Sequence, residues 1–249
     1  MVHSAKKQRT KIVGIIGAMS IEIDLLKKNL KPGTGSAEVQ EINAGGLVFY
    51  CGQLDGIAVV LVRSGVGKVN AALCAQRLVM QFSVTHIINT GIAGAMAGGL
   101  AVLDFVVSKD AVYHDMDATG FGYKITQIPQ MKRSVFVANK AMLDAAINAF
   151  SQLKESSAHK LIVGRVASGD QFINAKETKN RIKSICRPAC VEMEGAAIAH
   201  AAYVNKTPFI VIRCMSDMAD DNGERTYAFH EEKAAKLSAK LVRTMLPLF

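Results

Sequence analysis

Apolar runs of strand length alternate with segments of helical periodicity along most of this 249-residue chain. The runs predicted as strands are Lys11–Ile16, Leu47–Cys51, Ile57–Arg63, His86–Thr90, Asp104–Ser108, Leu161–Ala167, Ala189–Met193 and Phe209–Arg213. The predicted helices are Ile21–Leu30, Lys68–Phe82, Lys140–Leu153, Lys176–Ile185, Glu194–Tyr203 and Tyr227–Met245. This alternation predicts an α/β fold, a three-layer α/β/α sandwich, and the strand-rich region 47–63 favours a mixed central sheet over a purely parallel one.

One domain accounts for nearly all of the chain. Half of the residues are hydrophobic, enough for one large core, and we find no linker, internal repeat or low-complexity stretch. We therefore predict a single domain over residues 11–249, preceded by a basic disordered tail over residues 1–10 that carries Lys6, Lys7 and Arg9.

Composition argues against several classes of function. The formal net charge is +9, but Lys and Arg are scattered and no nucleic-acid-binding motif accompanies them, so we expect no nucleic-acid partner. No apolar run approaches the roughly 20 residues of a membrane span, and we expect no membrane association. The five Cys form no CxxC pair, which favours a reduced, cytoplasmic protein.

A metal site and a cofactor are also not expected. His114-Asp115-x-Asp117 resembles a metal cluster, but one imidazole and two carboxylates on a loop lack the ligands of a closed site. Capping and turn roles explain these residues, and no cofactor-binding motif is present.

Ionisable side chains follow the last two predicted strands. Glu192 and Glu194 stand at the end of one strand, and Arg213, Ser216 and Asp217 at the end of the next. Ligands of α/β proteins bind outside the carboxyl ends of the strands, so these groups are predicted to converge on one pocket. The alternative is a purely structural pair of Arg213 with a carboxylate.

Gly-rich or polar turns follow four other predicted strands, and they favour a shared rim around that pocket. The turns are Gly17-Ala18-Met19, Ser64-Gly65-Val66-Gly67-Lys68, Gly91-Ile92-Ala93-Gly94 and Ser168-Gly169-Asp170. Glycine at such a turn allows the backbone to approach a ligand closely. The spacing matches neither the P-loop nor the GxGxxG motif.

These residues suit the cleavage of a nucleoside. Its N-glycosidic bond breaks through an oxocarbenium-like transition state, which needs a base for water, polar contacts to the sugar and an acid at the leaving group. Glu22 could activate water, Glu194 could hold ribose hydroxyls and Asp217 could protonate the departing base. Apolar surfaces for the sugar and the base could come from Met19, Met193 and Phe172.

The ordered motif set resembles the 5'-methylthioadenosine/S-adenosylhomocysteine nucleosidase family from about Lys11 to the C-terminus. The motifs are Gly14–Met19 with Glu22, Ser64–Lys68, Asn89–Gly94, Ser168–Ile173, Val191–Glu194 and Ser216-Asp217. The resemblance implies a nucleoside phosphorylase-like fold, a homodimer, and hydrolysis of 5'-methylthioadenosine, S-adenosylhomocysteine and 5'-deoxyadenosine to adenine and the sugar. It also implies a place in methionine salvage and in removal of methyl-cycle by-products.

The resemblance assigns roles to individual residues. It implies that Glu22 is the general base and Asp217 the acid at adenine N7, oriented by Ser216, with Glu192 and Arg213 near the water. The implied substrate contacts are Met193 and Glu194 at the ribose, Phe172 and Ile173 at the adenine, and Met19 and Val66 beside the 5'-substituent. Phe121 and Pro129 match a loop that a dimer partner lends to the 5'-pocket.

Three places in the sequence depart from the family pattern. Ser20-Ile21 stands where many members have two acids, Ile92 where Ser is frequent and Tyr227 where Phe is frequent, and the last two are expected to line the substrate site. A phosphorylase is the first rival, but its Arg-containing phosphate loop has no counterpart at Gly17–Met19. The same base and ribose groups would also serve a 6-amino-6-deoxyfutalosine hydrolase of menaquinone biosynthesis, and a catalytically silent adenosine-binding homologue is the non-enzymatic possibility.

Overall fold

The computed structural model describes residues 10–220 and 223–249. The predicted tail thus lies, except for Thr10, outside the described residues. The strands are β1 Ile12–Gly17, β2 Gln40–Ala44, β3 Leu47–Leu54, β4 Ile57–Arg63, β5 His86–Ala95, β6 Phe105–Tyr113, β7 Phe136–Val137, β8 Leu161–Ser168, β9 Cys190–Glu192 and β10 Phe209–Asp217. The α-helices are α1 Ser20–Asn29, α2 Lys68–Phe82, α3 Lys140–Gln152, α4 Lys176–Cys186, α5 Gly195–Val204 and α6 Gly223–Met245. Short 3-10 helices are η1 Thr119–Phe121, η2 Lys154–Ser157 and η3 Leu246–Leu248.

All ten strands belong to one mixed sheet, which confirms the predicted fold class. The order is β10-β6-β8-β9-β5-β1-β4-β3-β2, with β7 paired to β6. Strands β1, β4 and β5 run parallel, whereas β2, β3 and β4 form an antiparallel meander. The meander agrees with the mixed pairing expected from the strand-rich region 47–63.

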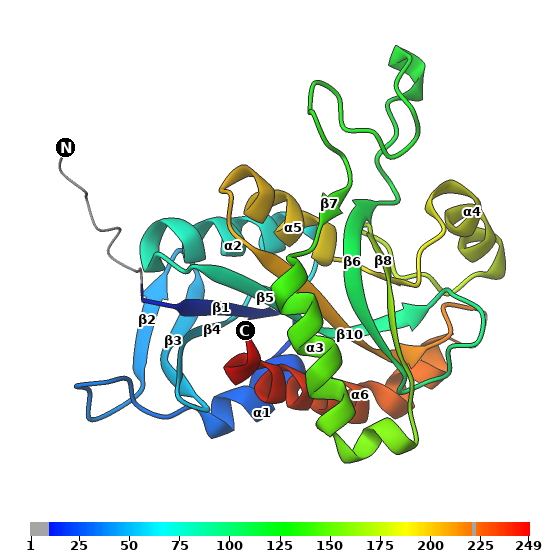
Figure 1. Ribbon diagram of the computed structural model, residues 1–249. Coiled ribbons are helices and arrows are strands. Elements are labelled where there is room, and N and C mark those ends of the chain that lie inside the picture. The colour runs from blue at the N-terminus through cyan, green and yellow to red at the C-terminus, as the bar shows by residue number, and fades with distance from the viewer. Residues whose placement is uncertain (1–9, 221–222) are drawn as a thin grey trace, which may run out of the picture.

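Helices cover both faces of the sheet (Figure 1). On one face α1, α3 and α6 pack on apolar strand residues such as Ile15 and Leu61. On the other, α2 and α5 pack on the alternate set, including Ile16 and Val62. Neighbouring residues of a strand therefore enter different cores, which explains why these strands are continuously apolar in sequence.

Part of the sheet closes into a ring. Strand β10 pairs with both β5 and β6, and β8 and β9 complete the path back to β5. Strands β5, β6 and β10 are consequently longer than predicted, and the expected turn Gly91–Gly94 is wrong because these residues belong to β5. The short strands β2 and β7 were not predicted.

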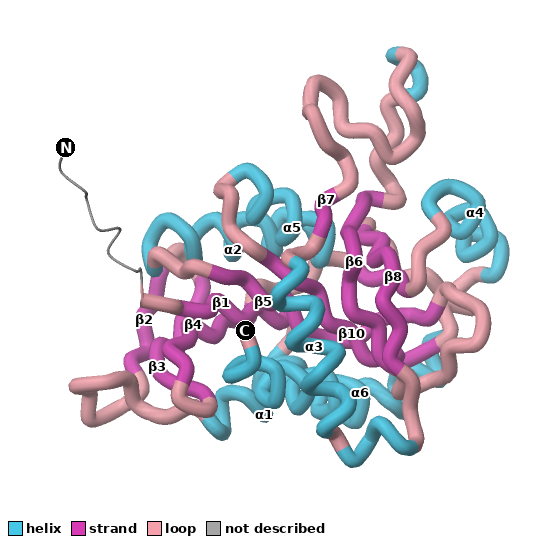
Figure 2. The backbone as a smooth tube through the Cα atoms, viewed as in Figure 1, coloured by secondary structure: helices cyan, strands magenta, loops and turns pink. Residues whose placement is uncertain are grey.

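A long segment, residues 114–135, projects from the body between β6 and β7 (Figures 1 and 2). Phe121 lies in η1 within this segment, and 87% of its surface is exposed. None of the described helices has the length and apolar character that crossing a bilayer requires.

Candidate active site

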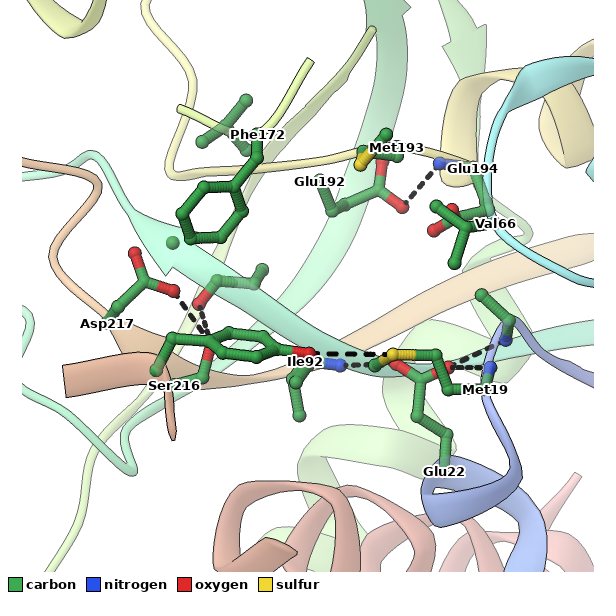
Figure 3. Close-up of a pocket in the computed structure, with 15 residues that line it drawn as sticks. Met19, Glu22, Val66, Ile92, Phe172, Glu192, Met193, Glu194, Ser216 and Asp217 are labelled. Carbon is green, nitrogen blue, oxygen red and sulfur yellow. Dashed lines mark hydrogen bonds between the residues drawn. The ribbon is translucent and has the colours of Figure 1, made fainter. Parts of the chain in front are cut away.

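A cavity of about 360 Å³ opens at the carboxyl ends of β1, β5, β9 and β10 (Figure 3). The predicted site residues that line it are Met19, Glu22, Val66, Ile92, Phe172, Glu192, Met193, Glu194, Ser216, Asp217 and Tyr227. Ile173 lines a small adjoining recess with Phe172 and Asp217, and Arg213 is buried behind Glu192. Phe121 and Pro129 are not among the residues that line the cavity of their own chain.

Glu22 is held at the first turn of α1. One carboxylate oxygen, Oε2, accepts hydrogen bonds from the main-chain N–H groups of Ala18 (2.6 Å) and Met19 (3.0 Å). The other, Oε1, accepts one from Ile92 (3.1 Å). Burial raises the pKa of Glu22, whereas the nearby Arg213 charge and the three N–H donors oppose the increase. The carboxylate is thus fixed in orientation by three main-chain donors.

Glycines of β5 make room for two site carboxylates. A Cβ atom at Gly91 would lie 2.2 Å from Oε1 of Glu22, and one at Gly94 would lie 2.8 Å from Oδ1 of Asp217. Both separations are too short for a real contact. These glycines therefore let the carboxylates of Glu22 and Asp217 lie directly against the β5 backbone. Glycine is common in turns for a different reason, and the sequence pattern therefore resembles a turn.

Glu192, at the end of β9, forms a buried ion pair with Arg213, in the middle of β10. Oε2 of Glu192 accepts from Arg213 Nη2 at 2.5 Å and from the N–H groups of Glu194 and Gly195 at the start of α5. Ser168 donates to the other oxygen of Glu192, and Asn89 accepts a second bond from Arg213. The ion pair of Arg213 with a carboxylate is thus present, and its partner Glu192 also lines the cavity.

Glu194 is buried beside that pair. Its Oε1 accepts a hydrogen bond from the N–H of Gly67 at 2.8 Å, and its Oε2 lies 4.0 Å from Arg213 Nη2. Burial, together with the Glu192 charge, raises the pKa of Glu194 to about 8. Near neutral pH this group can both donate and accept hydrogen bonds, which suits contact with hydroxyl groups.

Asp217 ends β10 on the other side of the cavity from Glu22 (Figure 3). Ser216 Oγ donates to its Oδ2 at 2.8 Å, and the N–H of Ala219 donates to its Oδ1 at 2.7 Å. Burial raises the pKa of Asp217 despite these donors, so the site favours a carboxyl that can carry a proton. The ion pairs of Arg213 are made with Glu192 and Glu194.

Aromatic and thioether groups form the apolar wall. Phe172 packs edge-on against Tyr227, with 5.6 Å between ring centroids, and the Tyr227 hydroxyl lies 3.5 Å from Met19 Sδ. Burial raises the pKa of Tyr227, so its hydroxyl keeps its proton. Such a wall accommodates a planar ring at one end and an apolar substituent at the other.

The ionisable side chains that line the cavity are mainly carboxylic acids. Among the described residues, none that lines it is a Lys or an Arg. The described part of the chain also has no group of three or more His, Cys, Asp and Glu side chains arranged to hold a metal ion. Asp117 accepts bonds from the N–H and hydroxyl of Thr119, a turn contact two residues along the chain.

Sequence reasoning missed the residues behind the cavity. Asn89 and Ser168 fix the Arg213–Glu192 pair, although their motifs indicate only turns or strand ends. The role of Asn89 could have been predicted, because it interrupts an apolar run that reads as a buried strand. A buried amide needs hydrogen-bond partners. Ala18, Ala93 and Val191 also line the cavity, and their small apolar side chains give no indication in the sequence that they belong to a site.

Comparisons with known proteins agree with this geometry. Residues 12–247 match the phosphorylase superfamily. The 5'-methylthioadenosine/S-adenosylhomocysteine nucleosidase of Colwellia psychrerythraea is 40% identical over 236 residues, 94% of each chain. The structure of a nucleosidase of that name and organism, in complex with adenine, matches with a TM-score of 0.89 and 39% identity over 96% of both chains.

A futalosine hydrolase of Helicobacter pylori has a similar structure but a more distant sequence. Its TM-score is 0.87, with 28% identity over 96% of this chain and 99% of the hydrolase. Fold alone does not separate the two activities, whereas sequence identity favours the nucleosidases. The chain therefore belongs to the phosphorylase superfamily and, within it, to the 5'-methylthioadenosine/S-adenosylhomocysteine nucleosidases.

Proposed function

We propose that this enzyme hydrolyses the N-glycosidic bond of 5'-methylthioadenosine and S-adenosylhomocysteine, releasing adenine and the corresponding 5-thioribose. The observation that carries the proposal is the placement of two buried carboxylates, Glu22 and Asp217, on different elements around one cavity. Burial raises the pKa of both, which makes each a better proton carrier than an exposed carboxylate. The similarity to nucleosidases supports the same activity.

The proposed reaction uses water as the nucleophile. Glu22 takes a proton from the water, the water oxygen forms a bond to the anomeric carbon, and the bond from that carbon to adenine breaks. Asp217 gives a proton to N7 of the departing adenine, which receives the electron pair of the broken bond. Acid and base catalysis of this kind each contribute about 10²- to 10⁴-fold in rate.

The remaining polar groups suit the sugar and the water. Glu194 would bond ribose hydroxyls, with Met193 against the sugar, while Arg213 and Glu192 stabilise the charge around the water. Ser216 would orient Asp217 through its 2.8 Å hydrogen bond. The absence of a lining Lys or Arg among the described residues supports water over phosphate as nucleophile, since phosphate needs a cationic cradle.

The apolar wall suits an adenine thioether. Phe172 would stack on the adenine, and Ile173, in the adjoining recess, would bond it through its backbone. Met19 and Val66 would flank the 5'-substituent, with Ile92 and Tyr227 beside the sugar. Ile92 contributes its main-chain N–H to Glu22 rather than a hydroxyl to the site.

A homodimer would complete the 5'-pocket. Phe121 and Pro129 lie on the projecting segment 114–135, from which they would reach the cavity of a second copy. Exposed apolar residues on α2 support an interface on that side: Val69, Leu73 and Met80. Burying such residues is the usual source of dimer stability.

The proposed setting is methionine salvage and methyl-cycle clearance in the cytoplasm. All five cysteines are free, which is typical of a reducing compartment. The proposal needs no metal or cofactor, because every proton transfer is assigned to a side chain.

The substrate can be tested with purified protein in phosphate-free buffer containing EDTA. We expect rapid release of adenine from 5'-methylthioadenosine and S-adenosylhomocysteine, and slower turnover of 6-amino-6-deoxyfutalosine. Faster turnover of aminofutalosine would assign the enzyme to the second activity, which the Helicobacter pylori similarity brings into consideration. Binding of adenine without turnover of any of the three would indicate a silent homologue.

A further inference from the structure

Lys68 links three separate segments at the rim of the cavity. Its Nζ lies 2.5 Å from Oδ2 of Asp115 and 3.6 Å from Oδ2 of Asp170. Its main-chain N–H donates to Oδ1 of Asp170 at 2.8 Å. The N–H of Asp170 in turn donates to Oδ2 of Asp115 at 3.1 Å, which closes a cycle of polar contacts. We refer to Lys68, Asp115 and Asp170 as the clasp.

Each member of the clasp belongs to a segment that carries part of the site. Lys68 begins α2 directly after Gly67, whose N–H holds Glu194. Asp170 stands two residues before Phe172, which lines the cavity. Asp115 stands at the base of the projecting segment 114–135. The clasp therefore joins the ribose side, the adenine side and the projecting segment.

The two carboxylates are held close together by the packing beneath them. His114 is 1% exposed, and its main-chain N–H donates to the carbonyl of Ser168 at 3.0 Å. Its ring lies against Gly169, where a Cβ atom would approach the ring to 2.3 Å. The ends of β6 and β8 are thereby fixed side by side, which brings the start of the Asp170 loop next to the base of segment 114–135 and leaves the two carboxylates to be neutralised by a cation.

We propose that Lys68 is a positioning residue for substrate binding: its ammonium group holds the Asp170 loop and the base of segment 114–135 together. This inference rests on the proposed function. Both carboxylates lie within 4 Å of the same ammonium group, and without that cation they repel each other, which favours movement of the less buried one. The Asp170 side chain is 50% exposed and that of Asp115 is 21% exposed, so the Asp170 loop, and Phe172 with it, would move.

The clasp should affect binding more than chemistry. Glu22 and Asp217 lie on α1 and β10, and among the described residues none of their hydrogen bonds involves the clasp. Loss of Lys68 should therefore raise KM and weaken adenine binding while leaving kcat nearly unchanged. A residue that only stabilised the fold would lower the thermal midpoint without separating KM from kcat.

Lys68→Met is the first test, with Lys140→Met as the matched control. Lys140 also pairs with an aspartate, Asp144 at 2.7 Å, but on the exposed surface of α3. For Lys68→Met we expect KM for 5'-methylthioadenosine and the Kd of adenine to rise about fivefold to tenfold, the size expected of a partly buried ion pair. The control should change neither value.

A second variant tests the charge argument. Asp115→Asn in the Lys68→Met background removes one of the repelling charges and keeps an oxygen that can accept the Asp170 N–H. We expect this double variant to recover most of the lost affinity. Failure of the double variant to recover affinity would overturn the repulsion mechanism and with it the role given to Lys68.

Hydrogen exchange of the ligand-free protein separates this inference from the proposed function. Lys68→Met should speed exchange in residues 114–135 and 169–175, and the control should not. Unchanged exchange, or faster exchange with unchanged KM and adenine Kd, would overturn the proposal. If the wild-type protein cleaved no nucleoside, the proposed function would fail, while adenine binding and exchange would still decide the role of Lys68.

Discussion

At the scale of single residues, the account depends on Glu22 as the base. Replacing it with Gln keeps the shape of the side chain and an oxygen for the backbone donors, but an amide cannot take a proton from water. We expect kcat for Glu22→Gln to fall by about 10²- to 10⁴-fold, with the Kd of adenine unchanged. Single-turnover kinetics and calorimetry on one preparation measure both quantities. A variant with near wild-type rate would transfer the base role elsewhere, with Glu192 the first candidate.

The raised pKa of Glu194 has a consequence for stability. The folded group titrates at about 8 and the unfolded group near its ordinary value of 4.5, so between these values the folded state binds more protons. The free energy of unfolding contributed by Glu194 is thus fully present below pH 4.5 and is lost as pH rises through 8.

Glu194→Gln removes this titration. We expect the variant and the wild type to melt alike near pH 4.5, and the variant to melt higher above pH 8, by roughly 2–4 °C for each kcal/mol recovered. Glu232→Gln, at an exposed carboxylate on α6, is the control. A melting difference that is constant with pH would contradict the pKa assignment.

At the scale of elements, β5 makes room for Glu22, the proposed base, at a residue without a side chain. Gly91→Ala places a methyl group where Oε1 of Glu22 lies, with a separation of only 2.2 Å, and Arg213 Nη1 is 3.2 Å away. Glu22 must leave its three backbone donors, so we expect kcat to fall by about 100-fold or more. Gly98→Ala is the control, because a Cβ atom there meets nothing within 4 Å. Equal rates for the two variants would show that Glu22 tolerates displacement.

Much of this element structure could be predicted from sequence, and the exceptions have physical causes. The central strands β1, β4 and β8 and the helices α2 and α3 follow their apolar periodicity closely. The extensions of β5 and β10 could not be predicted, because small and polar residues there pair through ring closure with distant strands. Likewise β9 has only three residues and depends on its neighbours in the sheet.

The candidate site was easier to predict than the strand ends. Glu22, Glu194 and Asp217 are far apart in sequence, yet each follows or ends a strand whose carboxyl end faces the same rim. Arg213 was harder, because its predicted position at a strand end did not reveal that Glu192, Asn89 and Ile212 enclose it. Its burial follows from its position in the middle of β10, which pairs with β5 on one side and β6 on the other.

At the scale of the whole molecule, the projecting segment makes the assembly testable. We expect a dimer in sedimentation, and we expect Phe121→Ser to raise KM for 5'-methylthioadenosine about tenfold, since burying a phenylalanine contributes roughly 1.5–3 kcal/mol. The Kd of adenine, which has no 5'-substituent, should stay the same. Phe229→Ser, at a residue on α6 with 82% exposure, is the control. A fully active monomer would contradict the shared pocket.

The central claim is that this site transfers the sugar to water. The most direct measurement is to let the enzyme consume 5'-methylthioadenosine in saturating phosphate and to identify the sugar product by phosphorus NMR and mass spectrometry. The account predicts free 5-methylthioribose, and a rate of adenine release that is unchanged when phosphate is omitted. Formation of 5-methylthioribose 1-phosphate, or loss of adenine release without phosphate, would contradict it.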